Sequence, residues 1–182
     1  MRGKIELTKE AILAAADYIP VTVKEQWVTD CADKCFDRLS ITADGEQMPP
    51  MYMINESLKA RYLMGAFVGM YLGLKYEPDG SDPLLMGVEE YDKWAGSHVF
   101  NQIERLKRDP DVRDKCFDLL CDYRALEKRF HSSIIGLLTV QNDSVIRQQD
   151  LMATQMKQMP ELMRQLKELT GKVEKDAEQS AV

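Results

Sequence analysis

A helical spacing of apolar residues in the second half of the chain is the feature that most constrains the fold. The steps between these residues are mainly three or four positions, which places them on one face of an α-helix. Asp109 and Pro110 precede the series and are typical of a helix start. Gly136 and the cluster Asn142-Asp143-Ser144 are expected to kink or interrupt the helix. The series is Val112, Cys116, Leu119, Leu120, Tyr123, Leu126, Phe130, Ile134 and Leu137.

Shorter amphipathic segments precede this long one. Helices are expected to begin near Thr8, at Thr22 with Glu25 completing a capping box, at Asn55 or Ser57, and near Val88. The second of these helices is expected to bury one apolar face. Residues 40–54 and 77–87 carry Pro, Gly and Asp and are expected to be loops. The apolar face of this second helix is expected to consist of Val28, Cys31, Cys35 and Leu39.

These patterns predict an all-α fold. We expect a helical bundle of about five to seven helices with a long, partly coiled-coil-like C-terminal helical region. A helical core domain is expected over residues 1–140. A C-terminal helical extension with a frayed tail is expected over residues 141–182.

Charge and hydropathy narrow the function classes. The 182 residues include 24 Lys and Arg against 30 Asp and Glu, a net charge of −6, which does not favour binding of nucleic acid over the whole surface. The first residues are not an apolar leader, and the mostly apolar stretch over 62–74 is shorter than a membrane-spanning helix. We expect no membrane contact and a cytoplasmic location.

Four cysteines lie in two pairs, Cys31 with Cys35 and Cys116 with Cys121. The first pair would share a helix face, whereas the second would point about 140° apart. Neither spacing is typical of a structural zinc site, so reduced core thiols are expected. His98 and His131 are expected to be ordinary surface or core residues. No metal and no cofactor is predicted.

Three glycines, Gly65, Gly69 and Gly73, recur every four residues in the third expected helix. Each costs about 1 kcal/mol relative to Ala in a helix, so a compensating contact is expected. One interpretation is a seam between two copies of the chain. The other is close packing within the same core.

One pentapeptide occurs twice. Asp33–Asp37 and Asp114–Asp118 have the same sequence, DKCFD. Duplication and convergence both explain the match. In either case we expect Cys and Phe to face a core and Asp and Lys to face water.

The chain lacks the common catalytic sequence motifs. The sequence holds no phosphate-binding glycine loop, no His-Glu-x-x-His pair and no Gly-x-Ser-x-Gly turn. Glu89, Glu90 and Asp92 form the best carboxylate cluster, but acidic residues are favoured at a helix start in any case. The chain is expected not to be an enzyme.

A sparser rhythm of seven residues runs through Val145, Met152, Met159, Leu166 and Val173. It predicts a weak coiled coil or a strip that binds in a groove. Pro160 is expected to break the pattern or to begin a last helix. Because methionine adapts to varied partners, the predicted apolar partner strip is Met152, Met156, Met159 and Met163. Ordinary core packing or self-association through this helix is the alternative interpretation.

A mixed stretch of charge between residues 105 and 129 allows two interpretations. It is either a salt-bridged exposed face or a small basic edge that contacts nucleic acid through Lys107, Arg108 and Arg113. Residues 8–16, TKEAILAAA, resemble the first helix of tetracycline-repressor-type regulators. No helix-turn-helix turn follows, so a DNA-binding regulator is the less favoured alternative.

Three stretches carry a further resemblance: Asp33–Leu39, residues 48–52 (MPPMY) and residues 94–102 (WAGSHVFNQ). In these stretches and in size the chain is similar to type II-A anti-CRISPR proteins of phages and mobile elements. The resemblance implies a non-enzymatic inhibitor that binds an RNA-guided CRISPR effector nuclease in the host bacterial cytoplasm.

Charge complementarity suggests which residues would make such a contact. The nuclease holds nucleic acid in positively charged channels, which an acidic protein can oppose. The alternative is a self-associating structural or regulatory phage-type helical protein. The acidic candidates for contact with the nuclease are Glu89, Glu90, Asp92, Asp30, Asp33 and Asp37.

Overall fold

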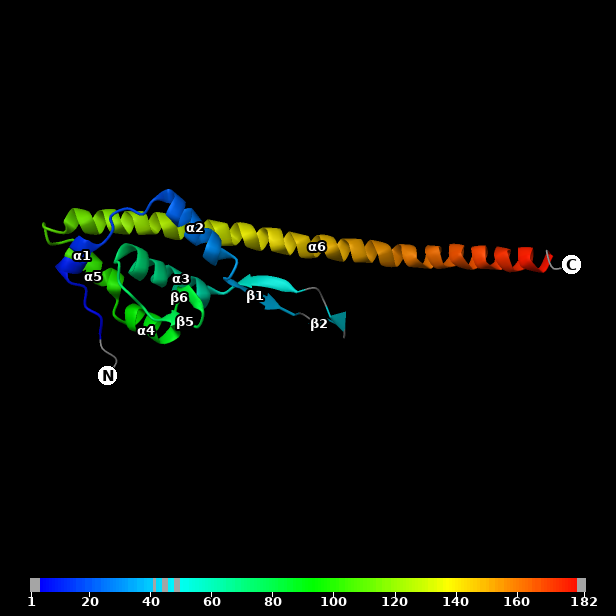
Figure 1. Ribbon diagram of the computed structural model, residues 1–182, viewed down its shortest axis with the longest axis horizontal. Helices are drawn as coiled ribbons and strands as arrows, with labels where there is room; N and C mark the ends of the chain where they lie inside the picture. Colours follow the sequence, from blue (N-terminus) through cyan, green and yellow to red (C-terminus); the bar gives the residue numbers. More distant parts are fainter. Residues whose placement is uncertain (1–3, 41, 44–45, 48–49, 180–182) are drawn as a thin grey trace. The chain divides into compact units, whose positions relative to one another are not determined.

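The computed structural model describes residues 4–40, 42–43, 46–47 and 50–179, and side chains over 4–40 and 50–164 (Figure 1). The chain divides into two compact units. The first unit is Met1–Leu39 with Tyr52–Thr139, and the second is Ser40–Met51 with Val140–Val182. The long helix α6, Arg113–Gln179, contributes to both units.

Two of the expected N-terminal caps are confirmed. The Thr8 hydroxyl accepts a hydrogen bond from the Ala11 amide (3.2 Å), and the Asn55 side chain accepts one from the Leu58 amide (2.9 Å). The Thr22–Glu25 capping box is wrong, because Pro20 is the residue that precedes α2. The helices before α6 are α1 Lys9–Ala14, α2 Val21–Ala32, α3 Glu56–Ala66, the π-helix η1 Phe67–Tyr71, α4 Val88–Gly96 and α5 Val99–Leu106.

Short strands contradict the predicted all-α fold. They pair in twos, with β2–β3 and β5–β6 antiparallel. The loops expected over 40–54 and 77–87 hold β2 to β6, whereas β1 lies in the expected continuation of the second helix. Strands of two to five residues are too short to show clearly the alternation by which a strand is recognised, and Pro78 and Pro83 lie within β5 and β6. The strands are β1 Phe36–Leu39, β2 Thr42–Ala43, β3 Glu46–Gln47, β4 Met51–Ile54, β5 Pro78–Asp79 and β6 Asp82–Met86.

Two expected helices end earlier than predicted. The α2 helix stops at Ala32, so Cys35 is buried outside the helix and Leu39, on β1, is 42% exposed. The segment over 88–107 is divided between α4 and α5. His98 lies at the break with φ 52°, in the left-handed region, which ends a right-handed helix.

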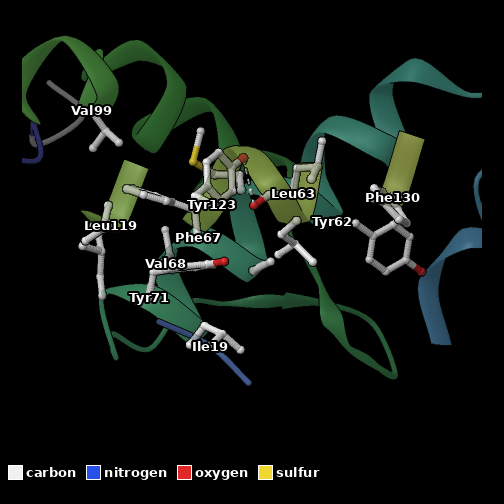
Figure 2. Close-up of a cluster of buried hydrophobic side chains, with 14 of the residues drawn as sticks. Ile19, Tyr62, Leu63, Phe67, Val68, Tyr71, Val99, Leu119, Tyr123 and Phe130 are labelled. Atoms are coloured by element: carbon white, nitrogen blue, oxygen red, sulfur yellow. Dashed lines mark hydrogen bonds between the residues drawn. The ribbon is translucent and has the colours of Figure 1, made fainter. Parts of the chain in front are cut away.

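The core of the first unit is rich in aromatic rings (Figure 2). The rings of Phe67 and Tyr123 lie 5.0 Å apart at a steep angle, and Phe100 lies 4.7 Å from Phe67 and 5.4 Å from Tyr123. Trp27 of α2 packs on Phe130 of α6 at 4.7 Å. The first part of α6 therefore buries the apolar face that the sequence predicts.

Two of the three glycines in the stripe, Gly65 and Gly69, are covered by other parts of the chain. A Cβ on Gly65 would lie 2.8 Å from the Leu84 carbonyl oxygen, and one on Gly69 would lie 3.2 Å from the Tyr76 ring. Gly73 follows η1 with φ +64°. Close packing within the core is therefore observed at Gly65 and Gly69, whereas a Cβ at Gly73 would meet nothing within 4 Å, and the homo-oligomer seam between two copies stays a prediction.

The α6 helix is continuous where the sequence suggests interruptions. It runs through Gly136, through Asn142-Asp143-Ser144 and through Pro160. Pro160 has no amide hydrogen, so the Met156 carbonyl lacks its usual helical donor. The helix tolerates this loss because the surrounding residues, mostly Gln, Met, Leu, Lys and Glu, favour helix.

Candidate interaction surface on α6

Residues of the second unit on α6 carry a row of exposed apolar side chains. We call Gln149, Met152, Met156, Met159 and Met163 the α6 strip. Its four methionines are 63%, 72%, 56% and 53% exposed, in chain order. Packed cores bury such side chains almost completely, so the strip has the composition of an interior and the exposure of a surface.

The spacing of the strip places its members on one face. Successive steps are three, four, three and four residues, an average of 3.5, which is the repeat of a coiled-coil seam. Ile146, Leu151 and Leu162 add apolar surface around the strip at 54%, 63% and 53% exposure. The methionines were predicted from the sequence, whereas these three residues and Gln149 were not singled out.

Charges near the strip lie on other faces of the helix. Arg164 pairs with Glu161 at 2.8 Å one turn away, and both are exposed. The Thr154 hydroxyl, on the face opposite the strip, donates to the Asp150 carbonyl oxygen at 2.8 Å. Such local contacts stabilise an exposed helix and do not involve the side chains of the strip.

Asp37 and Glu90, two of the predicted acidic contact residues, each accept two hydrogen bonds within the first unit. The Asp37 carboxylate accepts hydrogen bonds from the side-chain amide of Asn55 at 3.0 and 3.1 Å. Glu90 accepts from the Trp94 indole and from Lys93, each at 2.9 Å. These carboxylates hold local structure, and using them for a partner would break those bonds.

The other acidic candidates are exposed, and among them Asp30 accepts one hydrogen bond from the Gln26 side-chain amide at 2.9 Å. Asp30 and Asp33 line a shallow hollow of about 410 Å³ beside Lys34 and Asp82, which pair at 2.9 Å. Glu89 and Asp92 are exposed on α4, with Glu89 in its first turn. The structure thus brings Asp30 and Asp33 into one hollow, whereas Glu89 and Asp92 lie on a different helix.

The predicted basic edge is partly neutralised. Lys107 pairs with Glu104 at 2.9 Å and lies 6.0 Å from the centre of the Phe117 ring. Arg108 and Arg113 are exposed. Lys9 pairs with Asp109, which lies between them in the chain. This arrangement matches the salt-bridged face better than a basic surface for nucleic acid.

A buried ionic cluster was missed by sequence reasoning. Asp122 on α6 accepts hydrogen bonds from Lys24 (2.5 Å), from the Ile19 amide (3.0 Å) and from the Tyr71 hydroxyl (3.0 Å). Lys24 is only 3% exposed. A single Lys and a single Asp in separate helices give no sequence signal of a pair. The cluster ties α2 and η1 to α6.

The pKa of Asp122 reports the balance of forces in this cluster. Burial disfavours the carboxylate, but the hydrogen bonds from Lys24, Ile19 and Tyr71 outweigh it and hold the pKa below its ordinary value. Asp82 behaves in the same way. Burial opposes its charge, and bonds from Tyr62 and Lys34 lower its pKa.

The cysteines follow the core-thiol prediction with one exception. Cys31, Cys35 and Cys116 are buried and free, whereas Cys121 is free and exposed. Burial raises the pKa of Cys31 and of Cys35 to about 12, so both stay protonated at neutral pH. Among the described residues, no cluster of His, Cys, Asp and Glu is arranged to hold a metal ion.

Comparison with known proteins adds no relative. The chain matches no protein-family model, no curated protein and no solved structure. Within the described part of the chain, no helix is both long and apolar enough to cross a membrane.

Proposed function

We propose that this protein is a non-enzymatic interaction protein that binds a helical partner through the α6 strip. The observation that carries the proposal is the exposure of four methionines at coiled-coil spacing, each more than half open to solvent. An exposed apolar row of this kind is stabilised when another apolar surface covers it.

The chemistry of the strip supports binding of a helix. The average step of 3.5 residues keeps the strip in contact with a neighbouring helix along its length when the two supercoil. Methionine has a flexible, polarisable side chain that fills irregular gaps against a partner. Both properties fit a binding surface better than a reaction site.

The ionisable groups of the first unit support a role without catalysis. The carboxylate of Asp122 and the ammonium of Lys24 form an ion pair with each other. Arg61 donates hydrogen bonds to the Met86 carbonyl oxygen at 2.7 Å and to the Asp79 carboxylate. These charged groups make structural contacts that hold neighbouring helices and strands together.

A polarity-sensitive dye on the helix tests this proposal. Met156→Cys places the dye in the strip, and Thr154→Cys places it on the opposite face, both in a Cys121→Ser background because Cys121 is the exposed thiol. In concentrated host cytosol, the emission of the dye at 156 is expected to shift to the blue and that of the dye at 154 to stay unchanged. Equal emission at both positions would contradict the proposal.

A narrower form of the proposal follows from the resemblance to anti-CRISPR proteins: the partner is an RNA-guided effector nuclease. The exposed carboxylates of Asp30 and Asp33, gathered in one hollow, support contact with a positively charged channel. We expect the protein to co-elute with guide-loaded nuclease and to block DNA cleavage.

Two variants test the narrower form. The double change Asp30→Asn and Asp33→Asn is expected to weaken inhibition. The double change Asp114→Asn and Asp118→Asn removes the same number of charges from exposed positions on α6 and serves as the control. Separate elution with undiminished cleavage would refute the nuclease as partner. The dye experiment on the strip would be unaffected by that result.

A further inference from the structure

We infer that the partner of the α6 strip is the same helix of a second copy of the chain, parallel and in register. The inference rests on the proposed function, which identifies the strip as the binding surface. It adds the identity, the direction and the alignment of the helix that covers it.

The seven-residue repeat assigns each strip residue to a layer. Gln149, Met156 and Met163 occupy one core position of the repeat, and Met152 and Met159 occupy the other. The same register continues in the sequence through Leu166, Thr170 and Val173. Two such helices interlock side chains over the whole segment, whereas a flat or irregular surface would engage only part of it.

The residues beside the strip favour an identical helix. Different helices are paired by opposite charges at the positions that flank a coiled-coil core. Over residues 146–162 those positions carry no charge, so there they select no foreign partner, and two identical copies meet there without like-charge repulsion. In the described segment from 146 to 162 they are Ile146, Gln148, Ala153, Gln155, Pro160 and Leu162. Charged residues enter the flanking positions only farther along the sequence, at Lys167, Glu174 and Asp176.

Gln149 sets the direction and the alignment. It is the polar member of the described strip, in line with Met152 and Met156. In a parallel pair without stagger, the two Gln149 amides face each other, and each can donate to and accept from the other. In an antiparallel or shifted pair, a buried amide would face methionine without a partner, which is unfavourable.

The apolar area is sufficient for a dimer. Full burial of one such side chain removes on the order of 100 Å² from water. The methionines of the strip and their apolar neighbours are 53–72% exposed. Covering these side chains on two copies removes on the order of 800 Å² of apolar surface. Because interfaces between identical chains are about 65% apolar, the total interface is about 1,200 Å², the size at which specific interfaces begin.

Sedimentation and cross-linking of the full chain test the inference. We expect a dimer in sedimentation equilibrium. Met156→Glu is expected to raise the dissociation constant by about 100-fold or more, because it buries two facing carboxylates. Thr154→Glu adds the same charge on the opposite face and is expected to leave the constant within about threefold. In a Cys121→Ser background, Met152→Cys is expected to oxidise to a disulfide-linked dimer, and Thr154→Cys is not.

Each outcome has a distinct meaning. A dimer that fails to link through position 152 overturns the parallel, in-register arrangement. A chain that stays monomeric at all concentrations overturns self-association. If the dye at position 156 still shifts in cytosol in that case, the strip binds a foreign helix, and the proposed function stands without this inference.

Discussion

Asp122 illustrates how this molecule accommodates a charge in its interior. The residue lies on the face of α6 that meets α2, and its carboxylate accepts from an ammonium, an amide and a hydroxyl. Each donor comes from a different part of the chain: α2, the segment before it, and η1. One side chain thus holds three segments, and its loss leaves Lys24 buried without its counter-ion.

Replacing Asp122 by Ala is expected to destabilise the protein by about 3 kcal/mol, because removing one partner of a buried ion pair strands the other. Asp118→Ala, one turn earlier on α6 and exposed, is the matched control and is expected to change stability by less than about 0.5 kcal/mol. Urea unfolding followed by tryptophan fluorescence gives both values. Equal losses in the two variants would contradict a special role for Asp122.

The lowered pKa of Asp122 also predicts a pH dependence. In the unfolded chain the carboxyl protonates near its ordinary pKa of about 3.9, whereas in the folded chain it remains ionised to lower pH. The unfolded state therefore binds more protons in this window, and stability falls as the pH drops below about 4.

Urea unfolding between pH 6 and pH 3 measures this effect. The wild-type chain is expected to lose stability over this range more steeply than Asp122→Ala, which has no carboxylate at this position to protonate. A variant with the same slope as the wild type would show that Asp122 does not contribute to the acid sensitivity.

At the scale of elements, the continuous helical segment formed by α3 and η1 shows why glycines occupy a helix. The β6 strand passes so close to α3 that the Leu84 carbonyl occupies the space of a side chain at Gly65. Tyr76 covers Gly69 and donates to the Leu84 carbonyl at 3.1 Å. The low helix propensity of glycine is offset by this close approach.

Adding a methyl group at two glycines separates packing from propensity. Gly65→Ala is expected to destabilise by about 1–3 kcal/mol through overpacking against backbone. Gly136→Ala on α6, where a Cβ meets nothing within 4 Å, is expected to stabilise by about 1 kcal/mol. Thermal melts of the two variants should shift in opposite directions, and parallel shifts would refute the packing explanation.

The same elements show where sequence reasoning succeeds and where it stops. Local signals are recovered: the caps at Thr8 and Asn55 and the apolar face of α6. The methionines of the strip are exposed, and their role in binding stays a prediction. The twin pentapeptides show the limit. Residues 33–37 lead out of α2 into β1, whereas residues 114–118 are helical in α6. Phe117 is 58% exposed, contrary to expectation.

Non-local contacts account for that difference. The Cys35 carbonyl oxygen accepts a hydrogen bond from the backbone amide of Asn55 at 2.8 Å, a contact between residues far apart in the chain. Nothing in the pentapeptide encodes this partner, so tertiary context overrides local preference. The same argument applies to Asp122, whose three donors are assembled only by the fold.

The whole molecule divides by the source of its stability. The first unit has its own buried core, which contains Trp27 and Trp94 at 5% and 4% exposure. The described side chains of the second unit on α6 are mostly exposed beyond Gln149. A helix without tertiary packing gains stability only from its own residues and from a partner.

Two optical probes are therefore expected to disagree. Both tryptophans lie in the first unit, so fluorescence follows its unfolding, while the far-ultraviolet circular dichroism signal also includes residues 140–179 of α6. At low protein concentration the dichroism is expected to melt earlier than the fluorescence, and at high concentration the gap should narrow as association stabilises the helix. Coincident transitions at every concentration would contradict this division.

The four methionines of the strip also make the surface sensitive to oxidants. Peroxide converts a thioether to a sulfoxide, which replaces an apolar sulfur by a strongly polar group. A helix surface exposed by 53–72% at these residues reacts readily when it is alone and slowly when another helix covers it. Mass spectrometry of peroxide-treated protein would then record, methionine by methionine, how much of α6 is covered. An oxidised helix would lose the apolar contact that its partner needs.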